Sequence, residues 1–173
     1  MENFFEFFDL PVRIELDEKE LKRKFLKKSR EYHPDMVGSD DAAALEKAER
    51  MSAFTNEVYK TLSNKQERIS YILLLNGLVG APGQNQMSPE FLMEVMELNE
   101  AIMELQFEEN EAAKKVVLDR IQQFKSEIEQ DAQSHFTAFD AGDHSQPVLE
   151  GIRDYFLKHR YLLRMEENFN KTL

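Results

Sequence analysis

The chain has 173 residues, of which 42% are hydrophobic and 32% charged, with a formal net charge of −11 and no cysteine. The acidic charge argues against general nucleic-acid binding, and the absence of cysteine excludes disulfides and thiolate metal sites. The N-terminus carries no basic leader, and the longest apolar run, residues 71–75, is too short to span a bilayer. We therefore expect a protein of the reducing cytoplasm that binds neither nucleic acid nor a membrane.

The N-terminal part, residues 1–76, is predicted to be a helical domain, because Gly and Pro are scarce and strong helix formers are abundant. Asp17 followed by Glu20 resembles a capping box and predicts a helix start, and Pro34 cannot continue that helix. In chain order we expect a helical turn over 4–8, a helix from 17 to about 32, a loop over 33–41, a helix over 42–62 and a short helix over 64–75. These elements predict an antiparallel helical hairpin with flanking short helices.

Residues 77–87 contain glycines, a proline and several amides, a composition typical of a linker between domains. The two parts differ in charge, with 13 Lys and Arg against 15 Asp and Glu in residues 1–76, and 9 against 18 in residues 77–173. In the second domain, residues 88–173, we expect three helices, over 89–108, 111–139 and 145–170. Apolar residues spaced three and four apart on each helix predict an antiparallel three-helix bundle, so the whole chain is predicted to be all-α.

The tripeptide His33-Pro34-Asp35 follows a strongly basic helix and precedes a second helix. Such a tip presents an imidazole, a rigid backbone and a carboxylate that suits an arginine, and lysines on the preceding helix would steer it toward an acidic surface. Since the tripeptide has no nucleophile or pocket beside it, the pattern indicates docking rather than catalysis. On the residues alone, the alternative is an ordinary turn with a chance tripeptide and a solvated basic face.

A helix is predicted to begin with Ser88 as N-cap and Pro89 as first residue. It has more apolar residues than its buried side requires. The additional apolar residues are Leu92, Met93, Met96 and Met103, and a row of carboxylates beside them comprises Glu97, Glu100 and Glu104. This mixture predicts a binding surface for a partly basic, partly apolar protein, because methionine adapts well to partner surfaces. The alternatives are a packed helix with an acidic solvent face, and a metal site, for which the other helices supply no Glu-x-x-His pair.

Two histidines, His135 and His159, fall on the apolar seams of the later helices and are interpreted as core or boundary residues rather than ligands. We find no phosphate loop, nucleophile or metal set anywhere in the chain, so we expect no cofactor and no enzymatic activity.

The segment from about residue 3 to residue 75 resembles the J domain of the DnaJ family. The matching residues are Phe25, Lys27, Lys28, Tyr32, His33-Pro34-Asp35, the run from Asn56 to Ser63, Arg68 and Tyr71. The resemblance implies a four-helix module that stimulates ATP hydrolysis by DnaK-type chaperones, with His33, Pro34 and Asp35 required for stimulation. It also implies that Phe25, Lys27, Lys28 and Arg30 line the chaperone-facing side. Met36 departs from the lysine that many members have.

A J domain, a linker and a bundle that opens with Phe91-Leu92-Met93-Glu94 are together similar to the HscB family of iron–sulfur co-chaperones. The resemblance implies a protein that binds an IscU-type scaffold and targets it to an HscA/DnaK-type chaperone, whose ATPase it stimulates. The implied scaffold-binding residues are Leu92, Met93, Met96, Glu97, Glu100, Glu104 and, from the last helix, Tyr161. The alternative function is that of a general DnaJ-like co-chaperone for another client.

Overall fold

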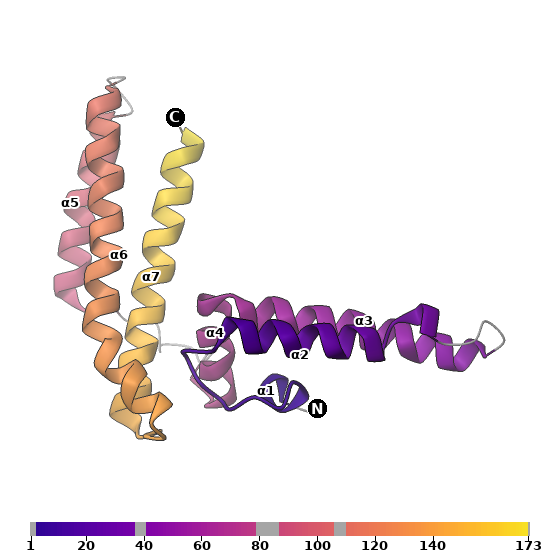
Figure 1. Ribbon diagram of the computed structural model, residues 1–173. Helices are drawn as coiled ribbons and strands as arrows, with labels where there is room; N and C mark the ends of the chain where they lie inside the picture. Colours follow the sequence, from indigo (N-terminus) through magenta and orange to yellow (C-terminus); the bar gives the residue numbers. More distant parts are fainter. Residues whose placement is uncertain (1–2, 37–40, 79–86, 106–109, 173) are drawn as a thin grey trace. The chain divides into compact units, whose positions relative to one another are not determined.

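The computed structural model describes residues 3–36, 41–78, 87–105 and 110–172, and over these residues the chain is helical and contains no strand (Figure 1). The predicted all-α class is therefore confirmed. The chain divides into two compact units, residues 1–76 and 77–173. Most of the predicted linker, part of the predicted 33–41 loop and the end of the helix expected over 89–108 lie outside the described residues. Within the described residues, no helix is both long and apolar enough to cross a membrane.

The first unit is built around a pair of antiparallel helices. Its elements are α1 (Phe4–Phe7), α2 (Glu18–Glu31), a short 3₁₀ turn (Pro34–Met36), α3 (Ala42–Ser63) and α4 (Lys65–Leu75). Helices α2 and α3 lie side by side, as Figure 1 shows. The predicted cap of α2 is confirmed, because the Asp17 side chain accepts hydrogen bonds from the backbone N–H groups of Lys19 and Glu20.

Aromatic side chains of α1 close the core of the first unit. Phe5 and Phe8 are fully buried, and the ring of Phe4 stacks on Tyr71 of α4 with centroids 4.2 Å apart. Residues of α4 are fully buried, together with residues from α2, α3 and the connection after α1: Ile14, Leu21, Val58, Leu62, Ile69, Ile72 and Leu73. This packing fixes the hairpin, so the 3₁₀ turn at its end is presented on a rigid support.

The second unit contains three long helices, α5 (Pro89–Leu105), α6 (Glu111–Asp140) and α7 (Gln146–Thr172). Helix α6 packs along α7 and also against α5 (Figure 1). The Ser88 hydroxyl accepts a hydrogen bond from the Phe91 N–H at 3.3 Å, as its predicted capping position requires. The buried seams contain Phe91, Val95, Leu98 and Leu105 of α5, Val117, Ile121, Phe124, Ile128, Ala132, Phe136 and Phe139 of α6, and Val148, Ile152, Tyr155, Leu162 and Phe169 of α7.

The predicted seam of α6 differs from the observed one near its C-terminal end. Ala132 and Phe136 are buried, whereas His135 is only half-buried. An α-helix has 3.6 residues per turn, so a pattern extended at 3.5 residues per turn drifts around a helix as long as α6. His135 consequently lies at the boundary of the core and not at its centre.

Candidate binding surfaces

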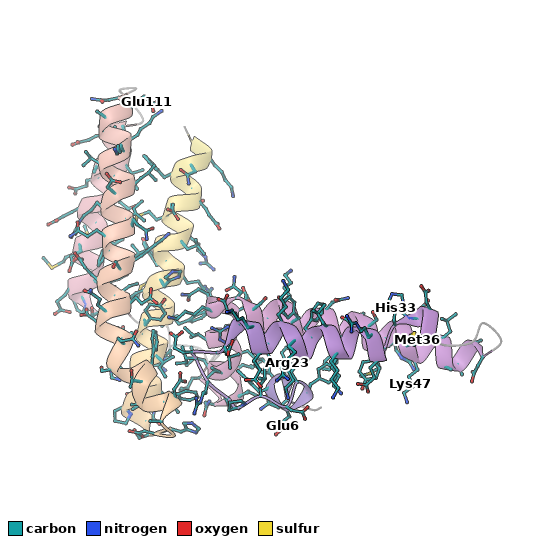
Figure 2. The ribbon with its side chains drawn as sticks, viewed as in Figure 1. Glu6, Arg23, His33, Met36, Lys47 and Glu111 are labelled. Atoms are coloured by element: carbon teal, nitrogen blue, oxygen red, sulfur yellow. The ribbon has the colours of Figure 1, made fainter. Side chains whose placement is uncertain are left out.

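The His33-Pro34-Asp35 tripeptide forms a compact tip at the end of α2. Pro34 begins the 3₁₀ turn, which is closed by the Met36 N–H donating to the His33 carbonyl at 3.0 Å. The Asp35 N–H donates to Nδ1 of His33 at 3.2 Å, so a neutral imidazole carries its proton on Nε2. Figure 2 shows His33 and Met36 together at this end of the hairpin, with Arg23 further back along α2. The tip therefore has one defined arrangement.

The carboxylate of Asp35 is the most available group of this tip. Its side chain is 89% exposed, and its Oδ2 lies 3.7 Å from Nδ1 of His33. An exposed carboxylate on a fixed turn is suited to a bidentate pair with an arginine of a partner. The geometry supports recognition, and no residue beside it is placed to act as a nucleophile among those that the structure describes.

One side of α2 forms what we call the basic face. It consists of Lys19, Lys22, Arg23, Leu26, Lys27 and Arg30, which line a shallow hollow together with Glu31. Two residues of the implied chaperone-facing set, Lys27 and Arg30, lie on this face and are exposed. The other members of the face were not identified from the sequence, although their spacing of three and four residues follows the helical period.

The structure does not bring Phe25 and Lys28 to the basic face. The half-buried ring of Phe25 stacks on Tyr59 of α3, with centroids 4.1 Å apart, so it joins the two helices of the hairpin. The Lys28 ammonium lies over the rings of Phe7 and Tyr32, 5.2 and 5.4 Å from their centroids. Desolvation alone would lower the pKa of Lys28, but Tyr32 and Glu31 raise it above its usual value. In this arrangement Phe25 and Lys28 stabilise the packing of the J-domain core next to the His33-Pro34-Asp35 tip.

In the second unit, the implied scaffold-binding residues of α5 all lie on its exposed side. We call this the α5 face: Leu92, Met93, Met96, Glu97, Glu100 and Glu104. Met93 is 67% exposed, and Met103, one of the additional apolar residues named from the sequence, is 59% exposed about two turns after Met96. None of Glu97, Glu100 and Glu104 forms an ion pair with another described residue, whereas Glu94 nearby approaches Arg120 at 3.8 Å. The face thus combines bare carboxylates with exposed apolar side chains.

Tyr161 of α7 lies beside α5. Its ring meets Phe91 edge-on, with centroids 6.1 Å apart, and the side chain is half-buried. It also lines a groove of about 300 Å³, together with Asn99 and Ile102 of α5 and Arg164 of α7. Because Phe91 directly precedes Leu92, Tyr161 lies near the N-terminal end of the α5 face.

The metal interpretation of the α5 carboxylates has no support in the geometry. Glu97, Glu100 and Glu104 are exposed instead of facing the bundle interior. In the part of the chain that the structure describes, no group of three or more His, Asp or Glu side chains could hold a metal ion.

Comparison with known proteins gives the class and then the family. Residues 4–71 match the DnaJ domain, and residues 87–170 match the HSCB C-terminal oligomerisation domain. A J domain followed by this helical domain defines a J-domain co-chaperone. The co-chaperone protein HscB homologue of Cupriavidus taiwanensis is 32% identical over 147 residues, which cover 82% of this chain and 80% of that protein. The chain belongs to the HscB family of co-chaperones, as the sequence resemblance implied.

Solved structures agree with this assignment. The crystal structure of human co-chaperone protein HscB covers 98% of this chain and 81% of its own, with a TM-score of 0.79 and 26% identity. Chaperone HscB from Vibrio cholerae has the same fold, with a TM-score of 0.79 and 24% identity, and covers 98% of this chain and 96% of its own. Membership of this J-domain family implies an Hsp70-type chaperone as partner.

Proposed function

We propose that this protein is a cytoplasmic co-chaperone of iron–sulfur cluster biogenesis, which binds an IscU-type scaffold and targets it to an HscA-type chaperone. It is an activator of the chaperone ATPase and not itself an enzyme. The observation that carries the proposal is the α5 face, where three carboxylates that pair with no described cation lie beside exposed apolar side chains. A J domain alone needs no such surface, so the second unit must have a partner of its own.

The J domain supplies the contact with the chaperone. Exposed cations of the basic face attract an acidic surface of the ATP-bound chaperone and raise the rate of encounter. The fixed tip then engages through His33 and Asp35, with the Asp35 carboxylate pairing a basic group of the chaperone. This contact promotes ATP hydrolysis in the chaperone.

The α5 face supplies the contact with the scaffold. Burial of Leu92, Met93 and Met96 in the complex would contribute at most about 25 cal/mol per Å² of apolar surface removed from water. Glu97, Glu100 and Glu104 would pair with cations of the scaffold, an arrangement that relieves the repulsion within their own row. Tyr161, whose half-buried ring meets the buried Phe91 edge-on, extends the apolar end of this contact.

One chain that carries both contacts converts scaffold delivery into an intramolecular event. Once the tip is bound to the chaperone, the scaffold on the α5 face is held at a high effective concentration beside the same chaperone. Tethering of this kind raises avidity without any new contact, so modest affinities at each surface suffice.

The test is steady-state ATP hydrolysis by the cognate HscA-like chaperone, with this protein and with or without the IscU-like scaffold. We expect the two proteins together to stimulate hydrolysis more than the sum of their separate effects. Asp35→Asn should abolish this stimulation and leave scaffold binding intact. Combined Leu92→Ala, Met93→Ala and Met96→Ala substitutions should do the reverse. All four positions are exposed, so the variants should remain folded.

The matched control is Leu163→Ala, because Leu163 is an exposed leucine of the same unit that lies on α7 and not on α5. It should leave both activities unchanged. Equal stimulation of the ATPase with and without the scaffold would instead indicate a general J-domain co-chaperone with another client. A folded variant that lost both activities would contradict the division between the two surfaces.

A further inference from the structure

Leu26 lies in the middle of the basic face. Its side chain is 45% exposed, although leucine is ordinarily among the most buried residue types. Neighbours on a helix surface are three and four residues apart, and three of the four neighbours of Leu26 are the cations Lys22, Arg23 and Arg30. Lys27 follows it directly, and all of these residues line the same shallow hollow. Leu26 is therefore an apolar side chain bordered by cations, and the acidic residue Glu31 also lines the hollow.

Several of the charges around Leu26 repel one another along the helix. Lys19, Arg23 and Lys27 follow one another at intervals of four residues, and such like-charge pairs are destabilising by about 0.2–0.5 kcal/mol each. Arg23 has one long ion pair, 3.5 Å to Glu20. Within the described chain Lys19, Lys22, Lys27 and Arg30 have none.

Lysines on the other side of α2 behave differently. Lys24 pairs with Asp9 at 3.6 Å, and Lys28 pairs with Glu31 at 3.7 Å. In a chain of net charge −11, acidic residues were available to neutralise the basic face as well. The concentration of unpaired cations around one exposed leucine thus indicates an acidic partner surface, by charge complementarity.

Charge alone would give this surface a fast encounter and a weak complex. Exposed ion pairs contribute about 0–1 kcal/mol and are screened by salt. Binding energy at interfaces is concentrated in a few central residues from which a surrounding ring excludes water. Leu26 has the central position, and the long stems of Lys22, Arg23 and Arg30 supply the ring.

We propose that Leu26 is the apolar anchor of the basic face, and that it inserts into an apolar depression on an acidic surface of the chaperone ATPase. This inference rests on the proposed function, because the occupant is the Hsp70-type chaperone that the tip engages. Leu26 then determines which chaperone the J domain prefers, since a chaperone without that depression would have to bury a polar group against leucine. The cations set the rate of encounter, and Leu26 sets the lifetime of the complex.

The test compares Leu26→Gln with the wild type in chaperone ATPase titrations with the full chain. Glutamine has a similar length and helix propensity, so the fold should be retained. We expect the concentration of half-maximal stimulation to rise about tenfold, with the maximal rate and the salt dependence unchanged. Leu26→Met should restore most of the affinity, because the swap conserves apolar volume. Lys22→Gln and Lys27→Gln should instead flatten the salt dependence.

The control is Leu74→Gln, which changes a leucine of the same unit that is 56% exposed on α4. Its titration curve should match that of the wild type. Equal half-maximal concentrations for Leu26→Gln, Leu74→Gln and the wild type would overturn the anchor role and leave the proposed function standing. Absence of stimulation by the wild type itself would overturn both.

Discussion

The imidazole of His135 lies against Gly151, where α6 and α7 approach each other. A Cβ atom added to Gly151 would lie 2.4 Å from Cδ2 and from Nε2 of His135, and 2.5 Å from Cγ. Atoms do not approach so closely, so alanine at this position of α7 would force the His135 ring to move. Glycine in a helix interior is disfavoured by about 1 kcal/mol relative to alanine, and the close packing of the two helices must offset that cost.

We expect Gly151→Ala to lower the free energy of unfolding by about 1–3 kcal/mol, because the ring must be displaced from its packed position. In a His135→Ala background the sign should reverse, since the clash is gone and alanine gains about 1 kcal/mol of helix propensity. Urea denaturation of the wild type, both single variants and the double variant forms a complete cycle. Additive effects would show that the two residues are not coupled.

His159 predicts a pH dependence of stability in the second unit. Burial lowers the pKa of His159 and the Lys125 ammonium lowers it further, against the opposing effect of Glu129 and Glu166. The folded state therefore favours the neutral ring, whereas the unfolded chain binds a proton near its ordinary pKa of about 6.5. The contribution is complete above that pH, and it is lost as the pH falls toward and through the lowered pKa of the folded state.

Urea midpoints measured at pH 7.5 and pH 5.5 check this expectation. The wild type should lose stability on acidification, and His159→Gln should lose less. His144→Gln is the control for replacement of a histidine, because His144 is exposed after α6. An identical change of the urea midpoint with pH in the wild type and in His159→Gln would show that other groups cause the acid sensitivity.

The sequence predicts those helix starts and ends that are determined by residues a few positions away. The start of α2 follows from Asp17, the end of α2 from Pro34, and the start of α5 from Ser88, because each acts on backbone groups only a few residues away. The stacking of Phe25 on Tyr59, by contrast, depends on how α2 packs against α3. The chaperone-facing role that family resemblance gave to Phe25 stays a prediction without a matching surface position.

The exposure or contact of a particular residue could not be predicted where it depends on packing between segments that are distant in the sequence. In the sequence, Leu26 is one of several apolar residues of an amphipathic helix. Only the packing of α2 on α3 shows that it is exposed. In the sequence, Gly151 is a residue that destabilises a helix. Only the structure shows that His135 of the preceding helix lies against it. In both cases the information lies in which face of a helix meets its neighbour, and helical periodicity alone does not fix that.

Met36 offers a test of how charge at the tip affects docking. It ends the 3₁₀ turn after Asp35, and its side chain is 76% exposed. Met36→Lys should change the free energy of unfolding by less than about 0.5 kcal/mol, because the side chain has little packing to lose. The added cation should speed association with the chaperone and steepen its salt dependence. Stopped-flow association at two ionic strengths measures both effects, and Met36→Gln separates charge from loss of the thioether.

Arg68 should be the most sensitive polar residue of the J domain. It is 6% exposed, its Nε donates to the Ile14 carbonyl at 2.8 Å, and its guanidinium also donates to the Leu62 carbonyl. These bonds join α4 to the connection before α2 and to the end of α3. Arg68→Met would remove both of these hydrogen bonds, at a cost of about 1–3 kcal/mol for each buried group that loses its partner.

We therefore expect Arg68→Met to destabilise the first unit and to weaken stimulation of the chaperone through partial unfolding. Scaffold binding should persist, because the α5 face belongs to the second unit. Arg23→Met is the matched control for loss of a cation, since Arg23 is exposed and makes one weak ion pair. Far-UV circular dichroism during urea titration gives the stability, and scaffold binding is measured on the same samples. Equal stability of the two variants would show that the buried guanidinium contributes no more than a surface charge.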